Sequence, residues 1–293
     1  MLLHCDRNAV NAPTTNPQTS SGLQHLQSPP RRIITISPNA TEMIAALGAA
    51  DRLIAVSDYC RPPESQESLP RIGGLIDPNL ERIITLKPDL VIIRGSNHEV
   101  EKLCETNRIA LYRDPTESYA DIFRTIRELG DLLNSRQQAA SLIERTESRI
   151  DRIANAIADR PRPRVLFTTG RTPESLTRVT TCGKGTFVDE VITRSGGANI
   201  FGDLDVAYPE VSLESIVSKR PEVIIEVMPG TPDPTGELQD RMTGQWQRLG
   251  DLPAVVDRRV YVLTDDEIII PSPRIADAIA RLVRLLHPEV SIE

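Results

Sequence analysis

The segment Cys182-Gly183-Lys184-Gly185-Thr186 combines the glycines, the lysine and the hydroxyl side chain that phosphate-binding loops use. A true loop of this kind has Gly-Lys-Thr in direct succession and an earlier glycine at a fixed distance, so we interpret the segment as a turn. Dinucleotide binding needs G-x-G-x-x-G after the first strand, and a hydrolase elbow needs G-x-S-x-G; neither pattern occurs. The motifs for phosphate, hydride or acyl transfer are therefore missing, and no catalytic residue is assigned.

Cysteine and histidine are scarce, with four of each in the chain. No two cysteines form a C-x-x-C pair, so no zinc or redox motif is indicated, and we expect thiols rather than disulfides. With so few histidines, the chain offers few imidazole ligands for a divalent metal bound directly by His and carboxylate side chains. A metal that is already bound in its own chelate needs no such ligands. We expect His98 to face solvent in a loop. The residues concerned are Cys5, Cys60, Cys104 and Cys182, and His4, His25, His98 and His287.

The composition is that of a globular protein, with 39% hydrophobic and 26% charged residues. The net charge of -7 argues against a nucleic-acid surface, which needs clustered Lys and Arg. No apolar run is long enough for a transmembrane helix. Residues 1–30 are rich in Ser, Thr, Asn, Gln and Pro, and we expect a disordered tail there. The tail shows no secretory signal, which indicates either a start further upstream or a protein that stays inside the cell.

Short apolar strands alternate with helices over residues 31–117, which predicts an N-terminal α/β lobe with a parallel sheet. After the first strand, Asn39 or Thr41 is expected to cap a helix that ends at Gly48. A second helix is expected at 80–86, before Lys87-Pro88. The expected strands are 33–36, 53–56, 90–93 and 110–112.

Helical spacing of apolar residues continues through residues 118–160. Its second part extends over about 24 residues, or ~36 Å, which fits a connector that crosses between lobes. Alternation of strands and helices resumes over 161–293 and predicts a C-terminal α/β lobe. Ser272 is expected to cap its last helix, with Pro273 in the first turn. The other elements expected in this lobe are strands at 165–167, 223–225 and 260–263, and helices at 186–193 and 213–219.

One stretch of sequence occurs twice. LERIITLKPDLVII at 80–93 matches LESIVSKRPEVIIE at 213–226, a constant 133 residues later, with five of fourteen positions identical. Each copy is expected to form a helix, a proline-marked turn and a buried strand. The duplication indicates two similar lobes, and clefts between domains are preferred ligand sites.

These segments, in their order, resemble one family. The chain contains ITISPNATEMIAALG, SDYC-RPP, NLERIITLKPDLVII, SGGANIF, YPEVSLESI and a final SPRI helix. The series resembles the helical-backbone (class III) substrate-binding proteins of ABC importers, which serve cobalamin, ferric siderophores and haem, over about residues 31–288. The resemblance implies an α/β fold with two Rossmann-like lobes, parallel sheets, one long helix joining them and a ligand cleft between them.

The resemblance also implies partners and a location. Glu81 and Glu214 match the glutamates that face arginines of the membrane permease; the alternative is that each carboxylate only stabilises a helix N-terminus. The implied partner is a transmembrane permease dimer with its ATPase, the protein itself being a monomer. The implied location is the periplasm, free or anchored to the outer leaflet of the membrane. No intrinsic cofactor and no protein-bound metal are implied.

Six residues are candidates for ligand contact. Tyr59, Tyr208 and Asp266 match family positions that touch the ligand. Two tryptophans of the cobalamin pattern fall at Leu75 and Arg94, and Arg94 suits a carboxylate or an anionic siderophore instead. Cobalamin or another corrinoid is the first ligand expected, with ferric siderophore or haem as alternatives; an intracellular enzyme on a related double α/β scaffold, or an adaptor without ligand, stays open. The candidate contacts are Ser37, Asn39, Tyr59, Arg94, Tyr208 and Asp266.

Overall fold

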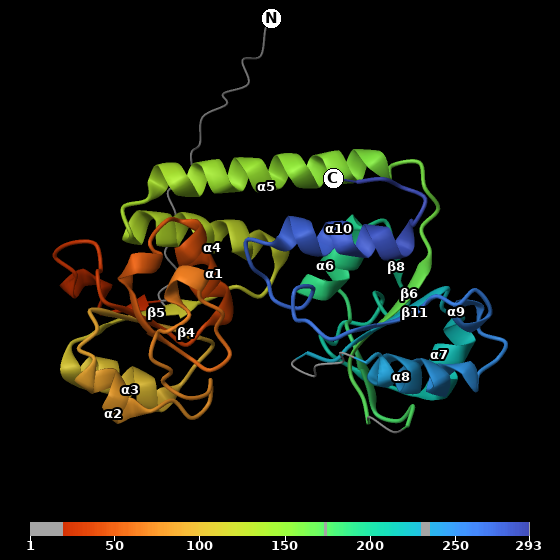
Figure 1. The fold of residues 1–293 in the computed structure, drawn as a ribbon, viewed down its shortest axis with the longest axis horizontal. Coiled ribbons are helices and arrows are strands. Elements are labelled where there is room, and N and C mark those ends of the chain that lie inside the picture. The colour runs from red at the N-terminus through yellow and green to blue at the C-terminus, as the bar shows by residue number, and fades with distance from the viewer. Residues whose placement is uncertain (1–19, 173–174, 230–234, 293) are drawn as a thin grey trace, which may run out of the picture. The chain divides into compact units, whose positions relative to one another are not determined.

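The computed structural model describes residues 20–172, 175–229 and 235–292 of the chain. The chain divides into two compact units, each built from separate stretches of sequence and each containing one sheet (Figure 1). Unit 1 comprises Met1–Ser37, Asp51–Cys60 and Ser68–Pro115. Unit 2 comprises Pro38–Ala50, Arg61–Glu67 and Thr116–Glu293.

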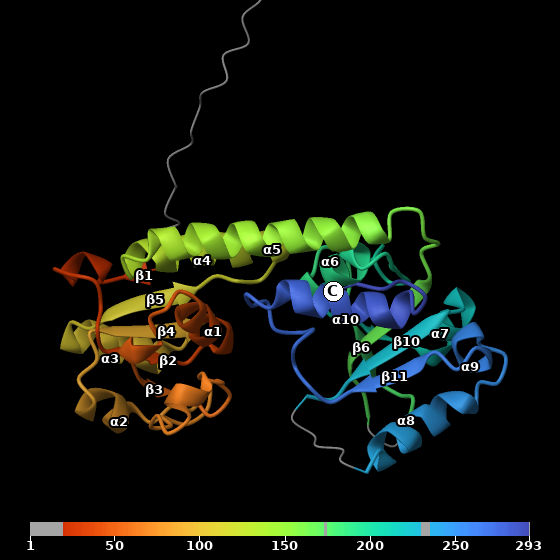
Figure 2. The same cartoon turned by 45° about the horizontal axis from the view of Figure 1, so that its top comes forward.

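The sheet of unit 1 has the strand order β1-β5-β4-β2-β3. Strands β2 to β5 are parallel, as the buried apolar runs predict, and Figure 2 shows them side by side. Strand β1 is antiparallel and pairs Ser20 with Tyr112 of β5. The strands are β1 Ser20–Ser21, β2 Ile33–Thr35, β3 Leu53–Val56, β4 Leu90–Arg94 and β5 Ala110–Asp114.

Strand β1 falls within the tail for which the sequence predicts disorder. Residues 1–19 lie outside the described residues, but residues 20–30 do not follow the prediction, because Ser20–Ser21 pairs with β5 and Leu23–His25 forms a 3-10 helix. An edge strand offers unpaired backbone groups to any extended chain, whatever its side chains. Composition therefore does not show where a polar tail first becomes ordered.

Helices α2 (Leu80–Thr85) and α3 (His98–Asn107) belong to unit 1. The strand residues Ile34, Val91 and Leu111 pack with Ile83 of α2 and Val100 of α3 in one buried cluster. The expectation that His98 lies in a loop is wrong, because it is the first residue of α3, although it is exposed. The side chain of Asn97 caps this helix by accepting a hydrogen bond from Val100 N at 3.2 Å.

Four helices of unit 2 pack together. Helix α5 (Arg136–Ala156) has 21 residues, about 31 Å, and lies against α4 (Tyr119–Leu132) and α10 (Ile275–Leu286), as Figure 1 shows. Helix α1 (Pro38–Ala46) packs on α4. Helix α4 begins with a capping box in which the Ser118 and Asp121 side chains each accept from the other residue's backbone N–H.

Two predicted helix caps are wrong. Helix α1 begins at Pro38, so Asn39 and Thr41 lie inside its first turns instead of capping it. Proline is favoured at the first helical position because its φ is already helical and its missing N–H is not needed there. Helix α10 begins at Ile275, and Ser272 forms a turn before it, its Oγ accepting from Arg274 N at 3.2 Å.

The sheet of unit 2 has the order β11-β10-β6-β7-β9, with β8 paired to β6. Strand β10 is parallel to both β6 and β11, but β7 is antiparallel to β6 and to β9. The expected parallel sheet is thus mixed, because β7 returns directly beside β6 without a crossover helix. The strands are β6 Arg164–Gly170, β7 Val179–Thr181, β8 Ala198–Asn199, β9 Glu210–Val211, β10 Val223–Val227 and β11 Val260–Leu263.

Helices cover both faces of the unit 2 sheet. On one face, Leu166 and Ile224 join a buried cluster with Ile216, Trp246 and Ala254, one from each of three helices. Helices α6 and α10 pack against each other on the opposite face. The remaining helices are α6 Phe187–Arg194, α7 Leu213–Lys219, α8 Glu237–Gln247 and α9 Pro253–Val256, and the further 3-10 helices are Ala50–Arg52 and Glu64–Gln66.

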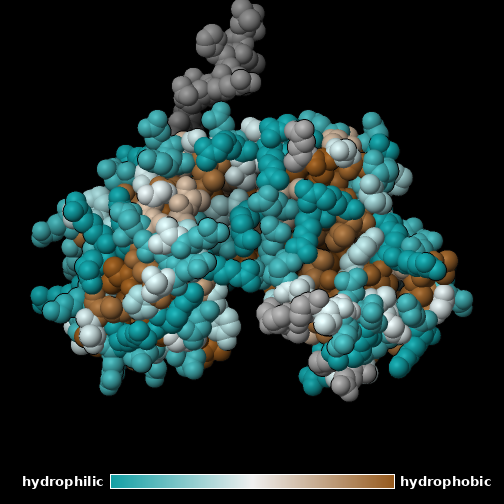
Figure 3. Space-filling view, in the orientation of Figure 1, coloured by the Kyte–Doolittle hydropathy of each residue, from teal (hydrophilic) through white to brown (hydrophobic). Residues whose placement is uncertain are grey.

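The surface is mainly hydrophilic on the face drawn in Figure 3, where hydrophobic side chains form small separate patches. Among the described residues, none of the helices has both the length and the hydropathy needed to cross a membrane. Single exposed hydrophobic residues are ordinary, so their positions matter more than their number. The large ones are Tyr59, Leu75, Ile76, Ile84, Val206, Tyr208, Val217 and Val256.

Candidate functional site

The predicted ligand contacts of unit 1 lie at one edge of its sheet. Ser37 follows β2, Tyr59 follows β3, and Arg94 is the last residue of β4. Arg94 is paired in register with Asp114, the last residue of β5. In open α/β sheets, ligands bind beyond the carboxyl ends of the strands, so the chain topology places these residues where a ligand is expected.

The Ser37 side chain makes a hydrogen bond within the fold. Its hydroxyl donates a 2.6 Å hydrogen bond to Oδ2 of Asp114, and both residues are buried. Asn39, on α1 in unit 2, is also fully buried. The sequence does not single out Asp114, whose carboxylate fixes the segment after β2 to the end of β5. Ser37 and Asn39 therefore have side chains inside the fold, unlike the two candidate tyrosines.

Tyr59 is 63% exposed and stands on a loop that Arg71 holds in place. Arg71 Nη1 donates to the backbone oxygens of Ser57 at 2.9 Å and of Cys60 at 2.7 Å. The Tyr59 ring lies beside Gly74, since a Cβ added there would be 3.8 Å from its Cε2. The loop thus presents an aromatic face to solvent, with its backbone fixed by a guanidinium from the next loop.

Leu75 and Ile76 follow Gly74 and are also exposed. The Asn97 side chain donates to the backbone oxygens of Leu75 at 3.3 Å and of Ile76 at 3.2 Å, so the loop is tied to the start of α3. Unit 1 therefore exposes three large side chains, Tyr59, Leu75 and Ile76, on the segment between β3 and α2. Ligand sites are lined mainly by hydrophobic and aromatic side chains, so these three suit contact with an apolar ligand.

Unit 2 also has a loop that exposes an aromatic and an aliphatic side chain, Tyr208 and Val206, which are 51% and 61% exposed. Its backbone is held against the turn at 183–185, because Gly183 N donates to Ala207 O at 2.8 Å and Lys184 N donates to Leu204 O at 2.8 Å. The sequence 182–186 is thus a turn, as predicted, and it supports the loop that carries Tyr208. Burial raises the pKa of the neighbouring Cys182 thiol to about 12, so this thiol stays protonated.

Gly183 is required where these two loops meet. A Cβ at this position would lie 2.0 Å from the Val206 carbonyl oxygen and 2.8 Å from that of Leu204. We expect Gly183→Ala to displace the Tyr208 loop and to lower the free energy of unfolding by about 1–3 kcal/mol. Chemical denaturation followed by circular dichroism measures this change.

Gly250→Ala is the matched control for Gly183→Ala. A Cβ at Gly250 meets nothing within 4 Å, and its φ is not in the left-handed region. We expect this control to leave stability unchanged or slightly raised. Equal stability of the two variants would contradict the close approach at Gly183.

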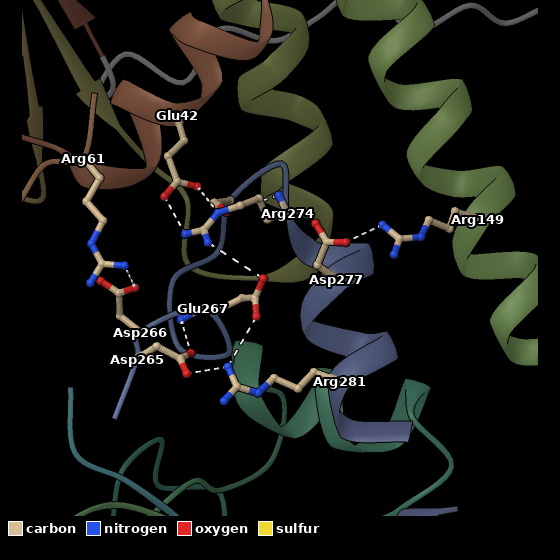
Figure 4. Close-up of polar contacts among 10 residues, drawn as sticks. Glu42, Arg61, Arg149, Asp265, Asp266, Glu267, Arg274, Asp277 and Arg281 are labelled. Carbon is tan, nitrogen blue, oxygen red and sulfur yellow. Dashed lines mark hydrogen bonds and ion pairs between the residues drawn. The ribbon is translucent and has the colours of Figure 1, made fainter. Parts of the chain in front are cut away.

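A cluster of ion pairs surrounds Asp266 in unit 2 (Figure 4). Asp266 Oδ1 is 2.9 Å from Nη1 of Arg61, whose side chain is 57% exposed, and Asp265 pairs with Arg281. Glu267 lies 3.5 Å from Arg281. The carboxylate of Asp266 is therefore already paired with a guanidinium, and the more exposed member of the pair is Arg61.

Arg274 connects this cluster to α1. It donates from Nη2 and Nε to the two carboxylate oxygens of Glu42 at 2.6 and 3.0 Å, and lies 3.8 Å from Glu267. The hydrogen bonds with Glu42 raise the pKa of Arg274, which stays protonated at all relevant pH. Paired charges of this type give a fixed polar surface.

Cys60, Cys104 and Cys182 are free and buried, which agrees with the expectation of unpaired thiols. In the described part of the chain, no group of three or more His, Cys, Asp or Glu side chains has the arrangement needed to hold a metal ion. The sequence did not identify Arg61, Arg71 or Gly183 as functional. Of these three, only Gly183 lies in a segment that the sequence singled out, and the glycines at 183 and 185 predicted a turn there.

The repeat seen in the sequence also occurs in the structure. Helix α2 with strand β4 and helix α7 with strand β10 correspond at the same spacing of 133 residues. The residue before proline has a positive φ in both copies, 47° at Lys87 and 44° at Arg220. Such a φ is uncommon for residues other than glycine, so its occurrence at both equivalent positions supports a duplicated unit.

Glu81 and Glu214 occupy the same place in the two copies. Each is the second residue of its helix and is exposed. Each helix also begins with a side-chain cap, Asn79 in one copy and Ser212 in the other. The carboxylates therefore stabilise their helices through the dipole, and they remain accessible to a partner.

Comparison with known proteins gives relatives along most of the chain. The vitamin B12-binding protein of Yersinia pestis is 31% identical over 254 residues, covering 86% of this chain and 84% of the relative. The crystal structure of the periplasmic vitamin B12-binding protein of Vibrio cholerae is 29% identical, with a TM-score of 0.72 over 88% of this chain and 97% of that one.

A periplasmic haem-binding protein from Roseiflexus is 25% identical, with a TM-score of 0.73 over 88% of this chain and 98% of that chain. The α/β fold class expected from the sequence is confirmed by these neighbours. Periplasmic binding proteins as a family match residues 33–267. The match includes both copies of the repeat and every candidate ligand residue, so this chain belongs to the periplasmic binding protein family.

Proposed function

We propose that this protein is the substrate-binding component of an ABC importer, that it captures a metal–organic chelate, and that it delivers this chelate to a membrane permease. The observation that carries the proposal is the pair of exposed tyrosines, Tyr59 and Tyr208, on loops that border the two sheets. Rigid aromatic faces beside a few polar groups suit a bulky, partly apolar ligand. No covalent step is part of the proposed function.

A corrinoid such as cobalamin is the first ligand we propose. Relatives that are vitamin B12-binding proteins match most of the chain, which supports this choice. Haem is the second choice, supported by the Roseiflexus neighbour. A ferric siderophore remains the third. Leu75 and Arg94 take the places of two tryptophans of the cobalamin pattern, and Arg94 offers a guanidinium to an anionic edge of the ligand.

In this proposal, a lobe of residues 31–117 and a lobe of residues 161–293 each contribute side chains that contact the ligand, and the helical segment 118–160 joins the lobes. Tyr59 and Arg94 serve from the first lobe and Tyr208 from the second. Asp266 acts through its pair with Arg61, while Ser37 shapes the edge of the sheet through Asp114. The protein works as a monomer on the periplasmic side, with a permease dimer and its ATPase as partners.

Isothermal titration of the purified protein with cyanocobalamin, haemin and a ferric siderophore panel tests the proposal. We expect one of these ligands to bind with a Kd of about 1 μM or tighter. Tyr59→Ala and Tyr208→Ala should each weaken binding about tenfold, because each removes an aromatic face. Val256→Ala, at another exposed apolar position, is the control and should bind like the unaltered protein.

Binding of haemin without binding of cyanocobalamin would change the ligand and keep the function. An absence of heat with all three ligand types would overturn the proposed function. Unchanged affinity in both tyrosine variants would move the ligand away from these two loops.

A further inference from the structure

The two copies of the repeat expose an aliphatic side chain at the same position. Ile84 on α2 is 44% exposed and Val217 on α7 is 40% exposed. Each lies three residues after the exposed glutamate of its copy, Glu81 or Glu214. Residues three apart are neighbours on a helix surface, so each helix presents a carboxylate and an aliphatic group side by side.

Local geometry is the same in both copies. Asn79 Oδ1 accepts from Arg82 N at 2.9 Å, and Ser212 Oγ accepts from Ser215 N at 3.1 Å, so both helices start at the same point. Ile83 and its counterpart Ile216 are fully buried and attach the helices to their units. These buried isoleucines hold the helices in place, while Ile84 and Val217 keep 44% and 40% of their surface exposed.

A single exposed aliphatic residue needs no explanation, but its presence in both copies does. β-branched residues are below average as helix formers, so local helix stability does not favour them here. In an interface, apolar groups at the centre supply affinity, while charges at the rim guide encounter. Each unit has one such pair, in which the carboxylate can serve as a charged rim residue and the aliphatic group as an apolar central residue.

We propose that Ile84 and Val217 form the apolar centres of two equivalent docking surfaces, with Glu81 and Glu214 at their rims. The occupant is a membrane permease of two like subunits, each of which presents a basic side chain next to an apolar patch. A duplicated surface on one chain fits a partner that offers the same surface twice. This inference rests on the proposed function and adds that affinity for the permease comes from apolar contact as well as from charge.

The test uses the full chain carrying both Ile84→Thr and Val217→Thr, which keep the branched shape and charge but make the side chains polar. Fluorescently labelled protein is titrated onto spheroplasts that express its own importer, at low and at high salt. We expect the half-saturating concentration to rise about tenfold, since two aliphatic contacts are lost. Salt should weaken the variant and the unaltered protein by the same factor, because the glutamates are intact.

Val256→Thr is the matched control, because Val256 is 65% exposed in unit 2 but lies outside the repeat. It should bind spheroplasts like the unaltered protein. Equal half-saturation of the double variant and the unaltered protein would overturn the inference and leave docking through the glutamates in place. Absence of any saturable binding by the unaltered protein would overturn the proposed function itself.

Discussion

We expect the replacement of Arg171 with methionine to lower the free energy of unfolding by about 3–5 kcal/mol, the cost of leaving a buried charge without its partner. The side chains of Arg171 and Glu226 are each 1% exposed. Arg171 donates from Nε and Nη2 to the two oxygens of the Glu226 carboxylate, and from Nη1 to Gln245 Oε1 at 2.5 Å. The change therefore leaves a carboxylate and an amide oxygen of the core without these donors.

Arg171 connects three elements at the carboxyl edge of the unit 2 sheet. It follows β6, Glu226 lies on β10, and Gln245 lies on α8. Its Nη1 also donates to Ser175 O at 2.9 Å. Denaturant titration followed by circular dichroism measures the loss of stability, which we expect as a lower midpoint with an unchanged slope.

Arg178→Met is the control for this experiment. Arg178 pairs with Glu210 at 3.3 Å, but the two side chains are 77% and 54% exposed, so the loss should stay below about 1 kcal/mol. The double replacement Arg171→Met with Glu226→Leu should recover much of the lost stability, since no charge then remains buried. Equal losses for Arg171→Met and Arg178→Met would show that burial does not decide the strength of this pair.

Reversing both exposed glutamates, Glu81→Arg with Glu214→Arg, should reduce ligand uptake by cells more than tenfold while the purified protein keeps its ligand affinity. Each new arginine replaces a carboxylate that faces a basic side chain in the proposed complex, and like charges oppose docking. Uptake of a radiolabelled chelate by cells that have this chain as their sole binding protein measures the first effect. Isothermal titration measures the second.

Glu99→Arg separates docking from helix stability. Glu99 is an exposed residue at the second position of α3, the same helix position as Glu81, but it lies outside the repeat. Any loss caused by a positive charge near a helix N-terminus should appear in this control as well. If the double glutamate variant loses ligand affinity, these residues belong to the ligand site and not to a permease surface.

Much of the fold follows from local sequence. Apolar β-branched runs predicted β2, β3, β4, β6, β10 and β11, because such runs fit a sheet that is covered on both faces. Periodic apolar residues predicted α4, α5 and α10, since a helix buries one stripe. Helix α3 was missed because Val100, Leu103 and Cys104 are too few to mark a stripe. The sequence also gave no sign of β7, which is short and carries two threonines.

The candidate site could be predicted only in part. The family pattern selected Tyr59 and Tyr208 as ligand contacts, and in the structure both lie on loops and are exposed. It could not show that the Asp266 carboxylate pairs with Arg61, because the two residues are far apart in sequence. For the same reason it missed Arg71 and Asp114, whose roles depend on contacts between loops.

The sequence by itself determined the strongly patterned helices and strands, the duplicated helix–turn–strand and the family, because these depend on spacing within short segments. Tertiary structure alone decided which side chains are buried and hydrogen-bonded within the fold, as Ser37 is with Asp114. It also decided which side chains remain exposed at the surface, as Ile84 and Val217 do. It also decided that the second sheet is mixed. Burial and hydrogen-bond partners depend on residues distant in sequence, so they arise only when the chain has packed.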